Sequence, residues 1–408
     1  MLDRVRPIKT PIKEILLLLA MLLSLEACVL KNPEATSLGT GPPPGGLVAE
    51  WAVQKEEVPA ALAEYAGYSM TFDSKRNRVV LLCFQLRSEP SRRSTALWAY
   101  ERGEGWFELS PSHSPTSAYS SFPGAGKIVY DPQGDRLLLF SIGVPPGPPP
   151  EVSDEPPPFP DESKSYLENR RGGWVLAWSY DARSRSWQYL PVSERPPGES
   201  GLWVVYDPKH NQVILLQAED FPNPHTPLET WAFDCRKNTW ERRRGLSSPP
   251  MNDYMSALTY DSGRDEVLLV GRPDGYERTT LRLWAYNYED DFWEERTAGN
   301  PPSSRHNFAL VYDDTLDATV LFGGTLWGAD PWTKEEEIEA HNLRIPWVYN
   351  SHRNCWEKIE YPSPLPIEEY QMVYDPFNQC GVLFLSTYVM SSADFKNYIL
   401  TLKIEPKP

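Results

Sequence analysis

In the segment FALVYDDTLDATVLFGG, residues 308–324, two apolar runs flank a short polar stretch. The first run ends in Tyr312, and Asp313 follows at the start of the polar stretch. An aspartate carboxylate at such a place accepts amide N–H groups of a turn, and short polar residues favour turns. The segment therefore predicts a β-hairpin.

Five further segments repeat this pattern of apolar run, Tyr or Phe, Asp, turn and second apolar run. They are YSMTFDSKRNRVVLLCF (68–84), GKIVYDPQGDRLLLFSIG (126–143), LWVVYDPKHNQVILLQ (202–217), SALTYDSGRDEVLLVG (256–271) and YQMVYDPFNQCGVLFLS (370–386). The aspartates are Asp73, Asp131, Asp207, Asp261, Asp313 and Asp375. Six copies of one hairpin indicate a repeat architecture.

A second pattern follows five of these hairpins: Trp, any residue, Tyr or Phe, an acidic or amide residue, a polar stretch and a second Trp. The pairs are Trp98–Trp106, Trp178–Trp187, Trp231–Trp240, Trp284–Trp293 and Trp347–Trp356. We interpret each pair as another hairpin, so that a complete repeat has four antiparallel strands, named a, b, c and d in chain order.

The two ends of the repeat array complement each other. The sixth repeat stops after its c strand, Tyr398–Ile404, whereas residues 50–59 (EWAVQKEEVP) read as a d strand without a repeat of its own. Pairing these ends would close a ring, remove the exposed faces of the terminal sheets and join the two ends of the chain. We therefore predict an all-β, six-bladed β-propeller with four antiparallel strands per blade, closed by an N-terminal outer strand that completes the last blade. A β-sandwich with chance repeats is the alternative.

The predicted propeller is one domain, residues 48–406, preceded by a signal peptide (1–27) and a Pro/Gly-rich tether (28–47). Its blades are expected at about 68–111, 126–192, 202–246, 254–298, 307–361, and 370–404 plus 48–54.

The repeat resembles the kelch repeat, most clearly in the fifth copy. The residues at kelch-like positions there are Pro302, Arg305, His306, Phe322, Gly323, Gly324, Trp347, Tyr349 and Trp356. The resemblance implies a kelch-type propeller similar to the central domain of galactose oxidase. Other copies depart from the family in lacking the double glycine.

The N-terminus carries an export signal. Basic residues precede an apolar run from Ile15 to Leu25, which is too short to span a bilayer and is typical of a signal peptide. Leu25-Glu26-Ala27-Cys28 resembles the bacterial lipoprotein signal, which implies lipidation of Cys28 and a place in the bacterial cell envelope. Val29 after it favours the outer membrane. Cleavage near Ala27 without lipidation is the alternative.

Composition excludes several classes of function. The 408 residues include 40 Lys or Arg and 56 Asp or Glu, and a net charge of −16 excludes binding to nucleic acid through phosphate contacts.

The remaining cysteines have no metal-binding spacing, so we expect mostly free, part-buried thiols and no zinc. They are Cys83, Cys235, Cys355 and Cys380. We predict no metal, no cofactor and a monomer.

A site is expected on the face formed by the b–c and d–a loops, which vary in length, whereas the a–b and c–d turns are short and uniform. The Pro-rich loop 143–173 reads either as a flap or partner-recognition strand, or as a solvated insertion. Trp327 and Trp332 in loop 325–345 either stack on a sugar ring or pack on a short helix predicted over Thr333–Asn342.

Arginine and histidine side chains on the same face complete the candidates. The predicted ligand-binding residues are Trp327, Trp332, Arg305, His306 and Arg272. Arg305 and His306 match kelch structural positions, so a purely structural role is their alternative. Other polar residues of this face are Arg92, Arg93, His113, Arg195, Glu219, Asp220, His225, Asp274, Arg278 and His341.

No catalytic residue is predicted. The two-His, two-Tyr copper site of galactose oxidase has no counterpart, and neither the sialidase Asp-box nor any GxSxG, P-loop or HExxH motif is present. The leading hypothesis is a non-catalytic envelope module that binds a protein or glycan partner. A carbohydrate-active enzyme that resembles sugar mutarotases or epimerases is the alternative, and an enzyme that resembles galactose oxidase ranks below it. A scaffold that spaces envelope components is a third interpretation.

Overall fold

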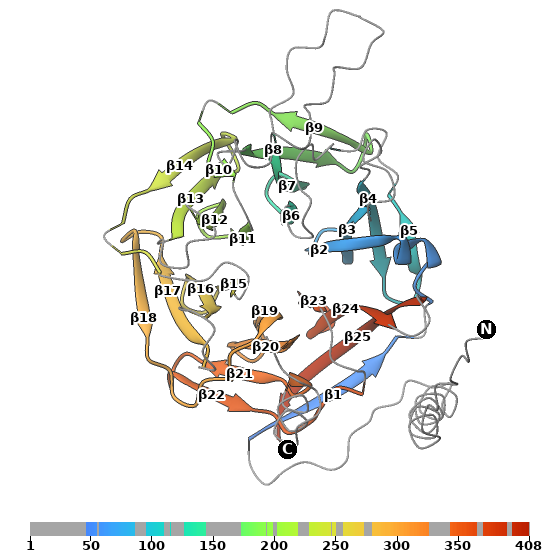
Figure 1. Cartoon of the computed structure of the whole chain (residues 1–408), viewed down its shortest axis with the longest axis vertical. Coiled ribbons are helices and arrows are strands. Elements are labelled where there is room, and N and C mark those ends of the chain that lie inside the picture. The colour runs from blue at the N-terminus through green and yellow to red at the C-terminus, as the bar shows by residue number, and fades with distance from the viewer. Residues whose placement is uncertain are drawn as a thin grey trace, which may run out of the picture.

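The computed structural model forms a ring of six four-stranded antiparallel blades around a central axis (Figure 1). It describes residues 46–54, 57–85, 95–109, 115, 126–143, 173–192, 194–198, 202–218, 228–245, 247–249, 256–272, 280–325, 343–364, 370–389 and 394–407. A single 3₁₀ turn, η1 (Ala60–Glu64), interrupts the strands of this part of the chain. The predicted all-β, six-bladed propeller is confirmed.

The first three blades follow the predicted repeats. Blade 1 consists of β2 (Tyr65–Asp73), β3 (Arg78–Gln85), β4 (Thr95–Glu101) and β5 (Gly105–Glu108). Blade 2 consists of β6 (Gly126–Asp131), β7 (Arg136–Gly143), β8 (Gly173–Asp181), β9 (Ser186–Leu190) and the two-residue β10 (Pro197–Gly198). Blade 3 consists of β11 (Trp203–Asp207), β12 (Gln212–Ala218), β13 (Leu228–Asp234) and β14 (Thr239–Arg243).

The other three blades complete the ring. Blade 4 consists of β15 (Ser256–Asp261), β16 (Glu266–Gly271), β17 (Arg282–Asn287) and β18 (Phe292–Arg296). Blade 5 consists of β19 (His306–Asp313), β20 (Ala318–Thr325), β21 (Trp347–Asn350) and β22 (Cys355–Lys358). Blade 6 consists of β23 (Tyr370–Asp375), β24 (Cys380–Val389), β25 (Asp394–Pro406) and the N-terminal β1 (Leu47–Val53).

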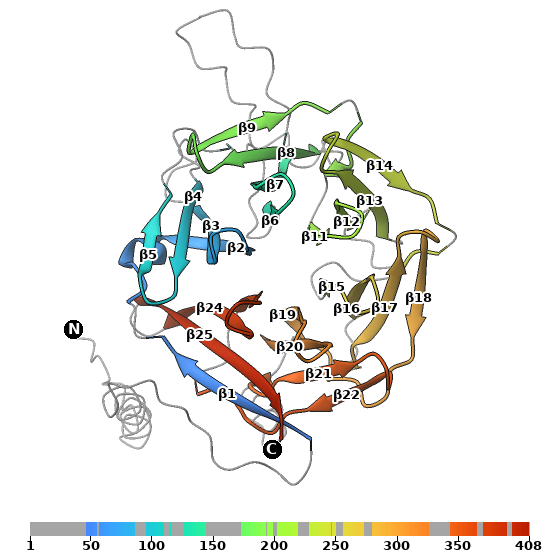
Figure 2. The same cartoon turned by 180° about the vertical axis from the view of Figure 1, so that it is seen from behind.

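The ring closes as predicted, through β1 at the outer edge of blade 6 (Figure 2). Trp51 lies opposite Leu402 in the β1–β25 ladder, and the Gln54 N–H donates to the Ile399 carbonyl at 2.9 Å. The Lys407 N–H donates to the Gly46 carbonyl at 2.9 Å, so the ladder runs to both ends of the described chain. β1 covers the edge of β25, which would otherwise present unpaired backbone groups to another chain.

Six apolar cores fill the spaces between neighbouring blades, and each contains the tryptophan of an outer strand. Trp51 is 2% exposed and packs 4.7 Å from Phe322 of the preceding blade, while its indole N–H donates to the Tyr361 carbonyl. In blade 4, Trp293 belongs to the core shared with blade 3, and its indole N–H donates to Thr230 Oγ1 of blade 3 at 2.9 Å. The high tryptophan content thus serves packing between blades.

Backbone pairing at the outer edge continues beyond the d strands. In blades 2, 3 and 4 a proline carbonyl beyond the d strand accepts a hydrogen bond from an N–H at or near the start of the c strand. The pairs are Val175 with Pro196, Leu228 with Pro249, and Leu281 with Pro302. In blade 2, β10 then pairs with the start of β8. These prolines lie at the sheet edge, where their missing N–H breaks no ladder.

The four described cysteines are free thiols, as expected, and Cys83, Cys235 and Cys380 are buried. Burial raises the pKa of each of these three thiols. Among the described residues no helix is long and apolar enough to cross a membrane. The signal peptide, Cys28 and most of the tether lie outside the described residues.

Candidate functional site

The propeller has two faces of different construction. On the turn face, all six a–b turns join strands that end and begin five positions apart, from Asp73 and Arg78 in blade 1 to Asp375 and Cys380 in blade 6. On the loop face, most residues of the b–c loops lie outside the described residues. The predicted contrast between uniform turns and variable loops is therefore visible in the strand bounds.

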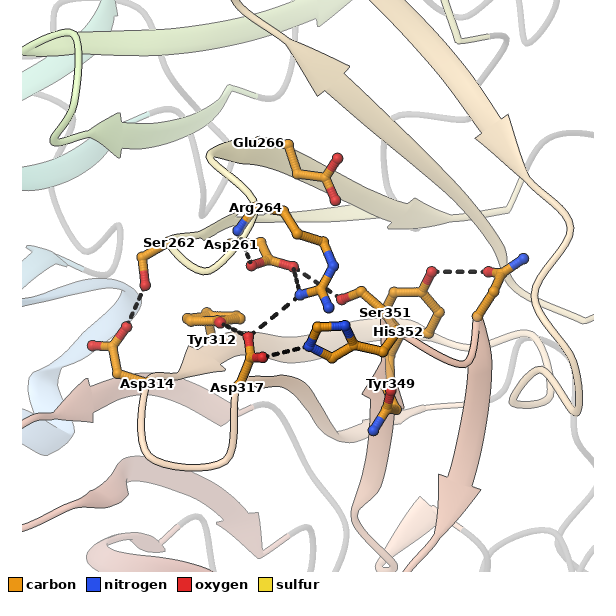
Figure 3. Close-up of polar contacts among 12 residues, drawn as sticks. Asp261, Ser262, Arg264, Glu266, Tyr312, Asp314, Asp317, Tyr349, Ser351 and His352 are labelled. Carbon is orange, nitrogen blue, oxygen red and sulfur yellow. Dashed lines mark hydrogen bonds and ion pairs between the residues drawn. The ribbon is translucent and has the colours of Figure 1, made fainter.

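The turn face carries a polar network, part of which lies between blades 4 and 5 (Figure 3). Arg264 Nη1 lies 3.3 Å from Asp261 Oδ2 in its own turn and 3.3 Å from Asp317 Oδ1 in the next turn. Tyr312 donates its hydroxyl to Asp317, and His352 Nε2 lies 2.7 Å from the other oxygen of Asp317. These hydrogen bonds lower the pKa of Asp317, that of Tyr312 contributing most.

The same arrangement recurs between blades 1 and 2. Arg76 holds Asp73 in its own turn and Asp135 in the next, and Tyr130 donates to Asp135. Asp135 and Asp317 both have positive φ, at the last position of their turns. We call this cation between two aspartates of adjacent turns the inter-blade latch.

The residue type at the last position of each a–b turn correlates with a residue in the a–b turn of the preceding blade. Where the preceding turn has a basic residue three positions after its first Asp, the last position of the next turn is Asp. These pairs are Arg76 with Asp135, His210 with Asp265, and Arg264 with Asp317. Where the preceding residue is neutral, the last position is Asn or Gln. These pairs are Gly134 with Asn211, Leu316 with Gln379, and Asn378 with Asn77. In two of the three basic pairs, Arg76 with Asp135 and Arg264 with Asp317, the structure has an ion pair that joins the two blades.

On the loop face, Arg305 lies just before the innermost strand of blade 5 and is 1% exposed. It donates to the carbonyls of Ser303 and Gly323 and to Ser303 Oγ. A side chain at Gly324, whose φ is +96°, would meet the Arg305 stem at 3.2 Å. Burial lowers the pKa of Arg305 to about 10. These contacts give Arg305 a structural role beneath the double glycine.

His306 begins β19 at the inner rim of the loop face and is partly exposed. Its Nε2 lies 2.6 Å from Thr325 Oγ1 on the neighbouring strand. Burial lowers the pKa of His306, which keeps the imidazole neutral at pH 7. A neutral imidazole beside a hydroxyl is equipped for proton transfer.

Two further polar residues end strands on this face. Arg272 follows β16 and is 4% exposed. Gln217, near the end of β12, is 1% exposed, and within the described part of the chain its amide has no hydrogen-bond partner. Gln217 was not among the residues predicted from the sequence, although a glutamine within the apolar run of this strand was a visible signal. Blade 5 brings Arg305 and His306 together, whereas Trp327 and Trp332 lie outside the described residues.

No family model matches the chain. Solved structures resemble it at the level of fold. A GH93 α-L-arabinofuranosidase of Fusarium graminearum, solved with an iminosugar inhibitor, has a TM-score of 0.55 and 8% identity, covering 86% of this chain and 96% of that one. The same enzyme with arabinobiose gives a TM-score of 0.54 and 7% identity, with the same coverage.

Two other solved proteins are similar over most of their length. YjhT has a TM-score of 0.50 and 12% identity, covering 86% of this chain and 99% of YjhT. A protein of unknown function from Dyadobacter fermentans has a TM-score of 0.52 and 12% identity, covering 92% of this chain and 100% of that one. At these identities the comparisons establish the fold of a six-bladed propeller, and the kelch family remains a resemblance.

Proposed function

We propose that this protein is a carbohydrate-active propeller that binds a sugar on the loop face, at the inner rim of blade 5. His306 carries the proposal, since it combines a neutral imidazole, partial exposure and a position at the inner rim. The proposed reaction is a proton-transfer conversion of the sugar, of the mutarotase or epimerase kind. In the mutarotase reaction His306 accepts the proton of the anomeric hydroxyl as the bond between C1 and the ring oxygen breaks, and the ring oxygen takes a proton from water; Thr325 orients the imidazole.

The comparisons support this proposal over the non-catalytic module that the sequence analysis favoured. The arabinofuranosidase shares the fold over 86% of this chain and has been solved with a sugar, arabinobiose. Hydrolysis itself needs two carboxyl groups about 5–9.5 Å apart. The loop-face acids Glu219, Asp220 and Asp274 lie outside the described residues, so hydrolysis is a second outcome that the assay must separate.

The test combines a glycan array with two activity assays on the purified chain. Anomeric exchange of reducing sugars is followed by NMR, and hydrolysis is followed with aryl α-L-arabinofuranosides. We expect His306→Gln to slow exchange by about 10²–10⁴-fold, as is typical for loss of a general acid or base, while sugar binding persists. His352→Gln on the turn face is the matched control and should leave exchange unchanged.

The loop tryptophans are tested in the same binding assay. If Trp327 and Trp332 stack on the sugar, Trp327→Ala or Trp332→Ala weakens its binding. Equal exchange rates in His306→Gln and the parent chain would refute the proposed role of His306. Saturable sugar binding without exchange or hydrolysis would instead favour the non-catalytic glycan-binding module.

We also propose that Cys28 anchors the protein to an envelope membrane with the loop face directed away from the bilayer. The described chain starts on the turn face, where Leu47 pairs with Pro406 and its N–H donates to Glu357 at 3.4 Å. A tether that leaves from this face places the turns nearest the membrane. Cys28→Ser should release the protein from the membrane fraction, and retention there would exclude a lipid anchor.

A further inference from the structure

Of the three basic residues at this turn position, the one in blade 3 is a histidine, whereas the other two are arginines. Arg76 and Arg264 occupy the third position after the first turn aspartate in blades 1 and 4, and His210 occupies it in blade 3. One carboxylate oxygen each from Asp207 and Asp265 and one ring nitrogen of His210 lie within 4.8 Å of one another. Asp207 is 1% exposed, in line with the first turn aspartates of the other blades, and its Oδ1 accepts the backbone N–H of His210 at 3.1 Å.

The imidazole of His210 is held in one orientation from outside this cluster. Its Nε2 lies 3.0 Å from Glu289 Oε1 in the c–d turn of blade 4, whereas its Nδ1 points to Asp207 Oδ2 at 2.7 Å. The ring stacks on Tyr288 with centroids 4.3 Å apart, and the Arg243 guanidinium covers Tyr288 at 4.4 Å. A carboxylate on the far nitrogen is the usual outer partner of a metal-binding histidine, since it directs the lone pair of the other nitrogen inward.

The two latches that contain arginine show that a cation lies between the two aspartates at this position. Each places a guanidinium between the first aspartate of one turn and the last aspartate of the next. In blade 3 the corresponding carboxylates are Asp207 and Asp265, and Lys209 forms an ion pair with Asp265 only. The His210 imidazole stands where the other latches have a guanidinium, so a cation bound between the two aspartates would occupy the place of that guanidinium.

We propose that Asp207, His210 and Asp265 form a binding site for a divalent transition-metal ion, with Zn²⁺ the preferred occupant. One nitrogen and two carboxylate oxygens suit Zn²⁺ better than Ca²⁺ or Mg²⁺, which prefer oxygen ligands only. Bonds of about 2.1 Å imply ligand separations of about 3.4 Å in a tetrahedral site, so binding draws the three side chains inward by roughly 1 Å. Lys209 moves away from Asp265 as the ion binds.

Sequence spacing could not reveal this site, because its ligands come from two blades. Asp207 and His210 are three residues apart in one turn, and Asp265 lies in the next repeat. Spacing within one segment therefore gave the expectation of no metal. The site would join blades 3 and 4 on the turn face, away from His306. The metal-site proposal and the proposed function can therefore be refuted independently of each other.

Isothermal titration of the purified full-length chain with ZnCl₂, together with thermal unfolding with and without ZnCl₂, tests the proposal. We expect one saturable site and an increase in Tm that EDTA reverses, with a much weaker response to CaCl₂ and MgCl₂. His210→Arg restores the latch of blades 1 and 4, so this variant should fold well, lose the isotherm and no longer respond to Zn²⁺. Glu289→Gln should weaken Zn²⁺ binding by about 10–100-fold, as loss of an outer partner does.

Asp317→Asn removes an aspartate of the same kind between blades 4 and 5 and serves as the matched control. It should lower Tm but keep the full response to Zn²⁺. The absence of an isotherm in the parent chain, or an unchanged Zn²⁺ response in His210→Arg, would overturn the proposal and leave His210 and Lys209 as the cations of this latch.

Discussion

Arg264 in blade 4 and Asp317 in blade 5 lie 3.3 Å apart although 53 residues separate them in the chain. Asp317 takes part because its positive φ places its carboxylate at the end of the turn, toward the preceding blade. Short polar residues such as Asp and Asn adopt this backbone conformation more readily than other side chains. One turn residue thus both closes its own hairpin and holds the neighbouring blade.

The first prediction concerns this ion pair. We expect Arg264→Leu and Asp317→Asn each to lower the free energy of unfolding, and the double variant to lose less than the sum. The Asp317 side chain is 44% exposed, so the coupling should be only about 0.2–1 kcal/mol. Urea unfolding of the four proteins measures it, and strictly additive losses would show that the two side chains do not interact.

A second prediction concerns ring closure. Trp51 fills the space between blades 5 and 6, and Trp51→Ala should lower the free energy of unfolding by about 3–5 kcal/mol, as for other large buried aromatic residues. Val53, on the same strand, is 37% exposed, and Val53→Ala should change it by only about 0.5 kcal/mol. Equal, small losses in chemical denaturation would mean that β1 contributes little to the ring.

The third prediction concerns pH. Hydrogen bonds from Arg76, Lys75 and Tyr130 lower the pKa of Asp135, with that of Arg76 contributing most. A carboxyl whose pKa is lower in the folded state stabilises the fold above its unfolded pKa of about 3.9, and the contribution disappears as pH falls. Asp135→Asn should therefore unfold more readily at pH 7, with a smaller difference from the parent chain at pH 3. Melting curves between these values check this, and a constant difference would contradict it.

A fourth prediction concerns a small cavity between blades 5 and 6, beside Gly381. A Cβ at Gly381 would meet only flexible Met372 Sδ closely, at 3.3 Å, so Gly381→Ala should raise the free energy of unfolding by about 0.4–1 kcal/mol. At Gly126 a Cβ would lie 2.5 Å from the Phe84 ring, and Gly126→Ala should cost about 1–3 kcal/mol. Calorimetry of both variants tests the pair, and destabilisation by Gly381→Ala would show that Met372 cannot move aside.

Much of the fold follows from the sequence, because strands with a period of two and turns with short polar residues are local signals. The repeated Asp, the paired tryptophans and the unmatched strand around Trp51 predicted six blades and their closure. The sequence also contained the pattern of the inter-blade latch, in which a basic residue of one turn is accompanied by Asp135, Asp265 or Asp317 in the next turn. The meaning of this pattern became clear only from the structure, which brings neighbouring turns into contact.

The site depended far more on tertiary structure. The sequence predicted both Arg305 and His306 as ligand-binding residues. In the structure their environments differ. Arg305 is buried and donates to backbone carbonyls, whereas His306 is partly exposed and neutral. Asp207 and Asp265 come from different repeats, and only the curvature of the ring brings their carboxylates around one imidazole. Local residue patterns determine strands and turns, whereas the contacts between blades, and hence burial and charge, arise only when the ring has closed.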